Sequence, residues 1–453
     1  MAEDITFVQS FLLAPFLSSC PEGKTSRVKK FLRHVQNTFS IAFLCATAGL
    51  VMVEMSATLG RSIASRSITT ADPMLITLVK NLWNCSYPIR AILILGIFKW
   101  KQSDWRNLHQ TAHRCLGELD PSREKSGRRL GRWSVVLFVV TFVALFVPVA
   151  LIWQHRPSPA TNASLHRDSE GHAKGHGCEF TYFGYCIPFA VLLALWTSFA
   201  DLPFLLSQQV LLAGIIFAMR VVRILKGVDR DVRHEIERLG SLRHCDTVLR
   251  VERVKMWTRT FVVCQLFLRQ FNAFYEWILL LSVGLDILAA LGLGAKILNP
   301  AKGPADTTAA LYLALVCFAF LAYATVFFIP FVQIGEESGK IDRSLRELIW
   351  IVKGHYSKHN EDEEHEVLRD QHSRQAKSAE ALSELSAIIQ QNPLAVEAGG
   401  LFSFSRRYLV TVVSSVATLL LVAQEVLDRT INLSPCQASR NDIANDSAIL
   451  EAN

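Results

Sequence analysis

The sequence predicts an all-α integral membrane protein with seven transmembrane helices, and three observations carry this prediction. Of the 453 residues, 51% are hydrophobic and only 19% are charged, whereas soluble domains carry about a quarter charged residues. Seven stretches are apolar over the roughly 20 residues that a helix needs to cross a bilayer. The lysines and arginines collect in alternate connecting segments, as they do in chains that cross a membrane repeatedly.

The predicted spans differ in how well they suit a bilayer. In chain order they cover 39–59, 74–98, 133–153, 189–219, 274–298, 308–333 and 408–426. The second is the least apolar, because Lys80 and Arg90 lie inside it. The fourth is longer than a bilayer requires, so we expect it to tilt or to extend beyond the membrane. The N-terminus lacks the basic-then-apolar order of a signal peptide, so the first span is expected to insert without a cleaved leader.

The distribution of basic residues predicts the orientation. Of the 47 lysines and arginines, 36 lie in the segments 1–38, 99–132, 220–273 and 334–407. Basic residues concentrate on the cytoplasmic side, so we expect the N-terminus inside the cell and the C-terminus outside. Three glycosylation sequons, at Asn162, Asn432 and Asn445, all fall on the predicted outer side.

The long segments on the predicted cytoplasmic side are expected to be helical. Residues 228–270 favour a helix, and residues 335–390 favour two helices separated by an acidic break at 360–366. Both segments carry apolar side chains such as Trp257, Leu345 and Trp350 among their charges. Stripes of this kind are usually buried against each other or against neighbouring subunits. The alternative is a set of solvated charged helices.

Several functional classes are not supported by the sequence. The ten cysteines lack the paired spacing of zinc modules, and there is no GxSxG, HExxH or phosphate-binding glycine loop. The net charge of +7 could suit nucleic acid, but the basic residues follow the membrane topology instead. We therefore expect a non-enzyme without cofactor, metal or nucleic-acid partner. G-protein-coupled receptors have the reverse topology, which argues against that class.

The last span carries a polar stripe. Thr411, Ser415, Thr418 and Glu425 recur at helical spacing along one face, with Ser414 beside them. Small hydroxylated residues often serve only helix packing. A glutamate at membrane depth is costly and should face water, a partner or a cavity. The stripe could therefore line a pore formed by several copies of this helix.

The C-terminal motif resembles that of the arthropod gustatory receptors, which are relatives of the insect odorant receptors. It reads Gly400-Leu401-Phe402, a polar step, Ala417-Thr418, five apolar residues and Gln424-Glu425. The family has Thr-Tyr in place of the Ala-Thr pair and Phe in place of the final glutamate. The length, the topology and the long helices before the last span are also similar to the family.

This resemblance implies a chemosensory receptor of the plasma membrane that acts as a ligand-gated, nonselective cation channel. It would be a homo- or heterotetramer with related subunits, embedded in lipid and opened by a small-molecule tastant. The implied organisation is a cytoplasmic N-terminal segment, six spans with cytoplasmic extensions, anchor helices, a pore-lining span and an extracellular tail. These regions cover 1–38, 39–333 with extensions at 220–273, 334–407, 408–426 and 427–453.

The pore residues follow from alignment with the family motif. They are Thr418, Leu421, Gln424 and Glu425. A ring of glutamates would favour cations electrostatically. The alternative is that Glu425 points away from the pore and pairs with Arg429, four residues further along the helix.

In this family the ligand pocket opens to the outside among the spans other than the last. The candidate ligand-binding residues in the outer half are Lys80, Asn81, Trp83, Trp196, Ser198, Asp201, Asp286 and Tyr312. A structural salt bridge between Lys80 and one of the aspartates is an alternative. The tryptophans could instead anchor their helices at the interface. A secondary transporter that uses Lys80, Asp201 and Asp286 is the alternative function.

Overall fold

A computed structural model provides the structure of the chain. It describes residues 27–65, 74–116, 119, 180–182, 185–187, 195, 197–241, 249–298, 328–359, 366–412, 414–415, 417–418, 421 and 425. The predicted span 133–153 and residues 308–327 of the predicted span 308–333 lie outside these residues, as do the tail 427–453 and all three sequons.

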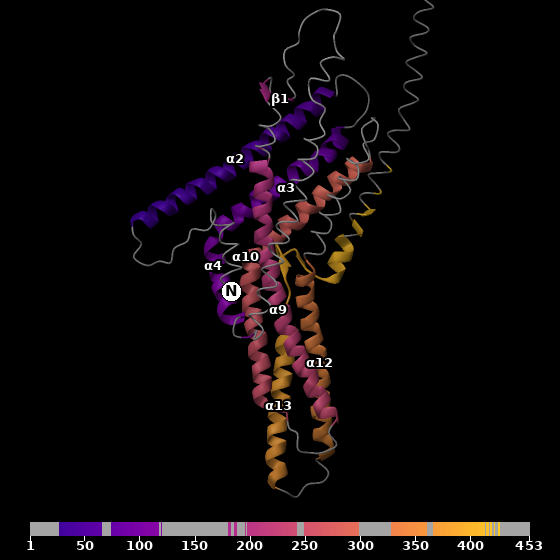
Figure 1. The fold of residues 1–453 in the computed structure, drawn as a ribbon. Coiled ribbons are helices and arrows are strands. Elements are labelled where there is room, and N and C mark those ends of the chain that lie inside the picture. Colours follow the sequence, from indigo (N-terminus) through magenta and orange to yellow (C-terminus); the bar gives the residue numbers. More distant parts are fainter. Residues whose placement is uncertain are drawn as a thin grey trace, which may run out of the picture.

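The described part of the chain is almost entirely helical (Figure 1). The helices are α2 (Arg27–Ser65), α3 (Met74–Trp100), α4 (Gln102–Thr111), η1 (Ala112–Leu116), η2 (Thr197–Asp201), α9 (Leu202–Ser241), α10 (Val251–Leu298), α12 (Ile329–His359) and α13 (Glu366–Gln391). The strands form two antiparallel pairs, β1 (Phe180–Tyr182) with β2 (Tyr185–Ile187) and β3 (Glu397–Ala398) with β4 (Phe402–Ser403).

The helices α2, α9 and α10 extend far beyond the thickness of a bilayer. They have 39, 40 and 48 residues, respectively. At a rise of 1.5 Å per residue they are about 58, about 60 and about 72 Å long, roughly twice the hydrocarbon thickness. By length and composition, the described residues contain three helical stretches apolar enough to cross a membrane, at His34–Val53, Ser198–Gly240 and Val251–Gly294.

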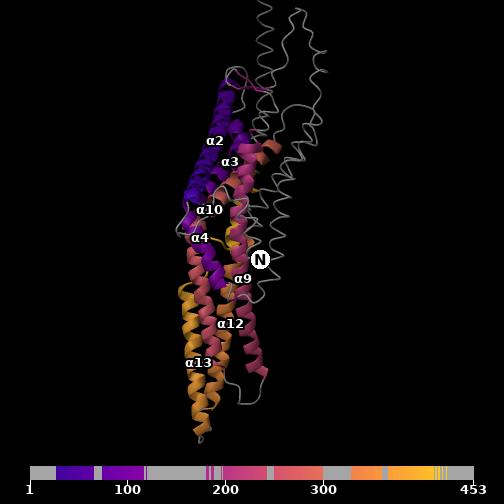
Figure 2. The ribbon, with the colours of Figure 1, turned by 60° about the vertical axis from the view of Figure 1, so that its left-hand side comes forward.

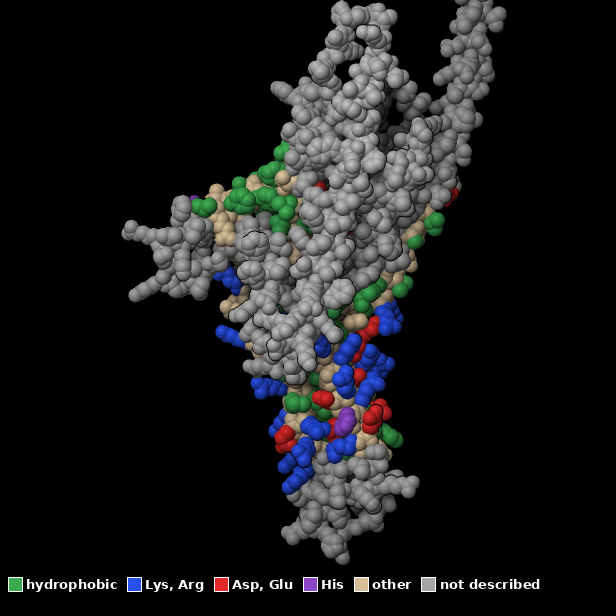
Figure 3. Space-filling view, viewed as in Figure 1, with side chains coloured by type: hydrophobic (Ala, Val, Ile, Leu, Met, Phe, Trp, Pro, Cys, Tyr) green, Lys and Arg blue, Asp and Glu red, His purple; other side chains and the backbone are tan. Residues whose placement is uncertain are grey.

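The lower ends of α9 and α10 form a bundle with α12 and α13, which we call the stalk (Figures 1 and 2). Its core contains Trp257, Leu345 and Leu348, each no more than 1% exposed. The expected burial of the apolar stripes is therefore confirmed for these residues, whereas Trp350 is 76% exposed. Charged side chains gather on the surface of the stalk, and the described surface above it is mostly hydrophobic (Figure 3).

The helix predictions for the two long charged segments have different outcomes. Residues 335–390 form α12 and α13, on either side of the expected break. The single helix expected over 228–270 is wrong, because α9 ends at Ser241 and α10 begins at Val251. Residues 249 and 250, directly before α10, are not helical, so α9 and α10 are separate helices. The acidic Glu252 in the first turn of α10 favours a helix start.

The Gly-Leu-Phe motif forms a short hairpin at the junction between the stalk and the helices above it (Figure 1). Gly399 and Gly400 have φ angles of 59° and 65°, a conformation that residues with a Cβ rarely adopt. The backbone N–H of Gly399 donates to the Glu276 carbonyl on α10 at 3.1 Å. A Cβ on Gly399 would lie 2.7 Å from Cδ2 of Leu280, so this close approach to α10 also requires glycine.

Candidate functional site: a buried charged cluster and its connection to the last helix

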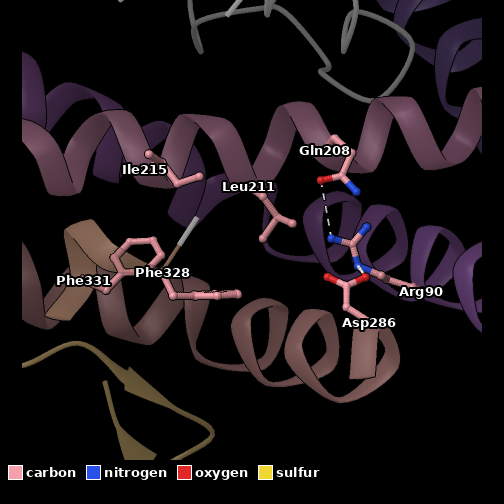
Figure 4. Close-up of a pocket in the computed structure, with 7 residues that line it drawn as sticks. All are labelled: Arg90, Gln208, Leu211, Ile215, Asp286, Phe328 and Phe331. Carbon is pink, nitrogen blue, oxygen red and sulfur yellow. Dashed lines mark hydrogen bonds and ion pairs between the residues drawn. The ribbon is translucent and has the colours of Figure 1, made fainter. Parts of the chain in front are cut away.

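A buried ion pair joins α3 to α10. Arg90 Nε lies 3.0 Å from Asp286 Oδ1, and the two side chains are 1% and 3% exposed. Burying two charges costs several kcal/mol per ion after relaxation, so such a pair is stable only when both partners are well satisfied. Intramembrane charges are therefore functional candidates. Figure 4 shows the pair enclosed by α3, α9 and α10.

Further contacts to Arg90 come from α9. Its terminal nitrogens lie 3.5 Å from the Ser207 hydroxyl and 3.5 Å from the Gln208 side-chain oxygen. If the Gln208 amide is rotated by 180°, its oxygen lies 2.7 Å from Nη1, an optimal hydrogen-bond distance. The guanidinium carbon also lies 5.2 Å from the centre of the Phe204 ring, within cation–π range. One arginine thus links α3, α9 and α10.

A second buried carboxylate lies near this cluster. Tyr87 donates a hydrogen bond to Asp201 Oδ1 at 3.1 Å, and both residues are buried. The Tyr87 ring meets the Phe204 ring edge to face, with centroids 5.6 Å apart. Tyr87 and Arg90 are three residues apart on α3, so one helix face supplies both partners.

A small cavity lies beside the ion pair. Its lining residues are Arg90, Gln208, Leu211, Ile215, Asp286, Phe328 and Phe331. Its volume is about 10 Å³, which is room for about one water molecule. An organic molecule could enter only if one of the walls moved. Chemically, the site offers a guanidinium, an amide and a carboxylate at one end and aromatic faces at the other (Figure 4).

The cavity wall is in direct contact with the segment that begins the last helix. Phe404 stacks on Phe328 with ring centroids 4.9 Å apart and an interplanar angle of 4°. It also contacts Phe331, at 5.6 Å. The last helical segment starts at Arg406, which forms a two-pronged contact with Glu336 of α12, with Nη2 and Oε2 3.0 Å apart.

The last helix presents most of its predicted stripe at the surface of the single chain. Thr411, Ser415, Thr418, Leu421 and Glu425 are all exposed and helical. Thr411 donates its hydroxyl to the Arg407 carbonyl at 2.8 Å, as solvent-facing threonines in helices commonly do. An exposed face of this composition is available to line an aqueous passage or to meet another subunit. Gln424 lies outside the described residues.

The structure places some of the predicted ligand residues together. Asp286 belongs to the charged cluster, and Asp201 lies near it on η2. Lys80, Asn81 and Trp83 lie on α3, but their side chains are outside the described residues, as are Trp196 and Tyr312. Asp286 contacts Arg90, and Asp201 contacts Tyr87. The alternative of a salt bridge to Lys80 stays a prediction, because that side chain lies outside the described residues.

Sequence reasoning missed four members of this site: Tyr87, Arg90, Ser207 and Gln208. The signal for Arg90 was present, since an arginine within a span has the same need for a partner as Lys80. Nothing in the spacing alone identifies Ser207 or Gln208, because they enter the site only through the packing of α9 against α3.

Comparisons with solved structures identify the fold. No protein-family model and no curated protein sequence matches the chain. The chain is similar to the insect olfactory receptor OR5 from Machilis hrabei in complex with eugenol, with a TM-score of 0.57, 11% identity, and coverage of 93% of this chain and 97% of that one. It is also similar to the structure of OR5 described without that ligand, with a TM-score of 0.51, 12% identity, and coverage of 93% and 100%.

The chain has the insect olfactory receptor fold. This confirms the fold expected from the C-terminal motif. The similarity extends over nearly the full length of both chains, so it includes the helices of the stalk and of the charged cluster.

Proposed function

We propose that this chain is the subunit of a chemosensory channel of gustatory type, which opens to cations when a small molecule binds. The observation that carries this proposal is the insect olfactory receptor fold over 93% of the chain. In the proposed assembly, four subunits meet in the plasma membrane, with the N-terminus inside and the C-terminus outside. The stalk, including the anchor segment 334–407, would hold the subunits together in the cytoplasm.

The pore in this proposal is lined by the last span, 408–426. The polar residues Thr411, Ser415, Thr418 and Glu425 along this helix support the proposal, because polar side chains at membrane depth are expected to face water or a partner and not lipid. Thr418 would line the passage, and Leu421, Gln424 and Glu425 would lie at its constriction. A ring of Glu425 carboxylates would attract cations and repel anions.

The ligand site in this proposal is the region of Asp201 and Asp286, opening toward Lys80, Asn81, Trp83, Trp196 and Tyr312. Aromatic faces and a few fixed polar groups are typical of small-molecule pockets. The OR5 structure holds eugenol, and a small aromatic molecule of this kind is a reasonable first probe. The transporter alternative needs carboxylates open to substrate, but Asp286 and Asp201 both have protein partners.

The proposal is tested by whole-cell current from cells that express this chain, over a panel of sugars, bitter compounds and eugenol. The wild type is compared with Glu425→Gln. We expect a ligand-evoked cation current whose permeability ratio or calcium block changes with this substitution.

The matched control is Glu384→Gln, which removes an exposed glutamate from α13 in the stalk. It should leave ion selectivity unchanged. A current that is indifferent to Glu425→Gln would remove this residue from the pore. Substrate uptake without channel-like current, with the protein at the cell surface, would favour the transporter instead.

A further inference from the structure

Two aromatic side chains belong both to the cavity and to the base of the last helix. Phe328 and Phe331 line the cavity beside Arg90 and Asp286, and the same two rings contact Phe404. All three phenylalanines are at most 3% exposed. The charged cluster and the start of the last helix are thus separated by a single layer of rings, which lies on the α12 side of the cavity in Figure 4.

The contact continues into the helix itself. The Phe404 ring meets Tyr408 edge to face, with centroids 5.2 Å apart, and Tyr408 stacks on Phe402 at 4.5 Å. Tyr408 lies in the first turn of the last helical segment. An unbroken series of ring contacts therefore runs from the cavity wall to the last helix.

The hairpin prevents this segment from moving freely. The Phe404 N–H donates to the carbonyl of Val396, the residue before β3, at 3.0 Å. Asn272 of α10 donates to the Ala395 carbonyl at 3.0 Å, and Gly399 is bonded to the Glu276 carbonyl. The hairpin is thus attached to α10, and Phe404 lies between Phe328 at the start of α12 and Tyr408 of the last helix.

The aromatic wall of the cavity lies where α12 begins. Arg90, Asp286 and Gln208 are restrained by ionic and polar contacts. Leu211 and Ile215 lie in the middle of α9, within a continuous helix. Phe328 immediately precedes α12, and its carbonyl accepts hydrogen bonds from the N–H groups of Phe331 and Val332 at 3.0 and 3.2 Å. The two rings therefore belong to the start of α12, which is the part of the cavity wall that also contacts Phe404.

We propose that Phe328, Phe331 and Phe404 are positioning residues that transmit occupancy of the cavity to the last helix. We call these three residues the aromatic link. The inference rests on the proposed function, since it describes how the ligand site would act on the pore. Close-packed interiors have discrete arrangements, so a small shift at one end becomes a repacking at the other.

The test measures the amide hydrogen exchange of residues 406–412 in the full chain, reconstituted in lipid nanodiscs. No ligand is added, and no ionic current has to be recorded. Ile215→Phe inserts a ring into the cavity, and Ile215→Ala enlarges it. Each should change the exchange rate of residues 406–412 by at least about threefold. In a Phe404→Leu background the same substitutions should change it by less than about 1.5-fold.

The matched control background is Phe261→Leu, a similarly buried ring on the stalk portion of α10. There the effect of the Ile215 substitutions should persist in full. Exchange of residues 378–391 in α13 serves to identify any variant that has lost its fold. If one Ile215 variant does not fold, the other decides.

Two results would overturn the aromatic link: equal effects with and without Phe404, or no effect of a folded Ile215 variant on residues 406–412. Failure of the proposed function has a different signature, because a chain that conducts no ions can still show the exchange coupling.

Discussion

Buried carboxylates occur both around the cavity and in the stalk, but they are stabilised in different ways. Asp286 pairs with Arg90, and both side chains are nearly inaccessible. In the stalk, Asp342 pairs with Arg346 one turn away on the same helix, and that arginine is 61% exposed. The stalk pair is therefore open to solvent through its arginine, whereas the pair beside the cavity is not.

The stalk carboxylates also hold neighbouring helices in register. Asp342 accepts hydrogen bonds from Ser386 and Gln390 of α13, at 3.1 and 3.3 Å. Asp229 of α9 accepts from Ser344 of α12 at 2.9 Å. Such bonds to neutral donors contribute about 1 kcal/mol each and give a specific alignment.

The two regions differ in how much stability is lost when one partner of an ion pair is removed. Loss of one partner in the stalk exposes a charge that water can solvate. Loss of one partner beside the cavity leaves a charge with no solvent, and the cost is correspondingly larger. Arg90 on α3 is buried where an unpaired charge is this destabilising, so it is a better candidate for a role in function than the charged residues of the stalk.

The largest expected effect comes from Asp286→Asn, which leaves Arg90 buried without its counter-charge. We expect a loss of about 3–5 kcal/mol of stability. The matched substitution in the stalk, Asp342→Asn, should cost about 1 kcal/mol or less, because Arg346 is solvated. Thermal unfolding of the purified chain in detergent measures both.

A double variant, Arg90→Met with Asp286→Leu, separates charge burial from packing. It should recover most of the stability lost in Asp286→Asn. Equal losses of stability for Asp286→Asn and Asp342→Asn would show that the buried pair and the stalk pair do not differ as expected.

The next effect concerns the hairpin that joins the two regions. Gly399→Ala introduces a Cβ at positive φ and 2.7 Å from Leu280, whereas Gly400→Ala meets the same backbone restriction with nothing within 4 Å. We expect a loss of about 2–3 kcal/mol for the first and about 1–2 kcal/mol for the second. The difference between their unfolding midpoints isolates the contact with α10, and equal midpoints would show that Leu280 moves aside without cost.

The smallest effect is a pH dependence at the contact between Glu336 and Arg406. The hydrogen bond from Arg406 holds the pKa of Glu336 below its usual range. A carboxylate with a lowered folded-state pKa contributes stability above its unfolded pKa and loses that contribution as the pH falls through the folded-state value. We therefore expect the wild type to lose more stability than Arg406→Gln between neutral pH and about pH 3.

The measurement is the unfolding midpoint of each protein across this pH range. Parallel curves for the two proteins would mean that this contact adds nothing, as is common for exposed ion pairs. The ionic contact between α12 and the last helix would then be dispensable, and the hairpin and the ring contacts of Phe404 would join them.

Much of the fold could be predicted from the sequence because hydrophobic length and charge asymmetry act locally. The predicted spans 39–59 and 274–298 lie within α2 and α10, and 335–390 forms the two expected helices. The break at Ser241 was not predicted, because charged residues continue on both sides of it and a charged helix resembles a charged turn in composition.

The candidate site was only partly predictable. Asp286 stood out as a charge in an apolar span, and its need for a partner followed from electrostatics. The pairing with Arg90 could not follow, since only the rotation and tilt of α3 against α10 decide which side chain of α3 meets Asp286.

The sequence by itself determined that the chain is helical, with several stretches apolar enough to span a membrane, because composition and periodicity are properties of short segments. Only the tertiary structure decided that the Gly-Leu-Phe hairpin contacts α10 and that Phe404 stacks on a wall of the cavity. These contacts join residues far apart in the chain, and they depend on the angles at which long helices pack, which no local pattern specifies.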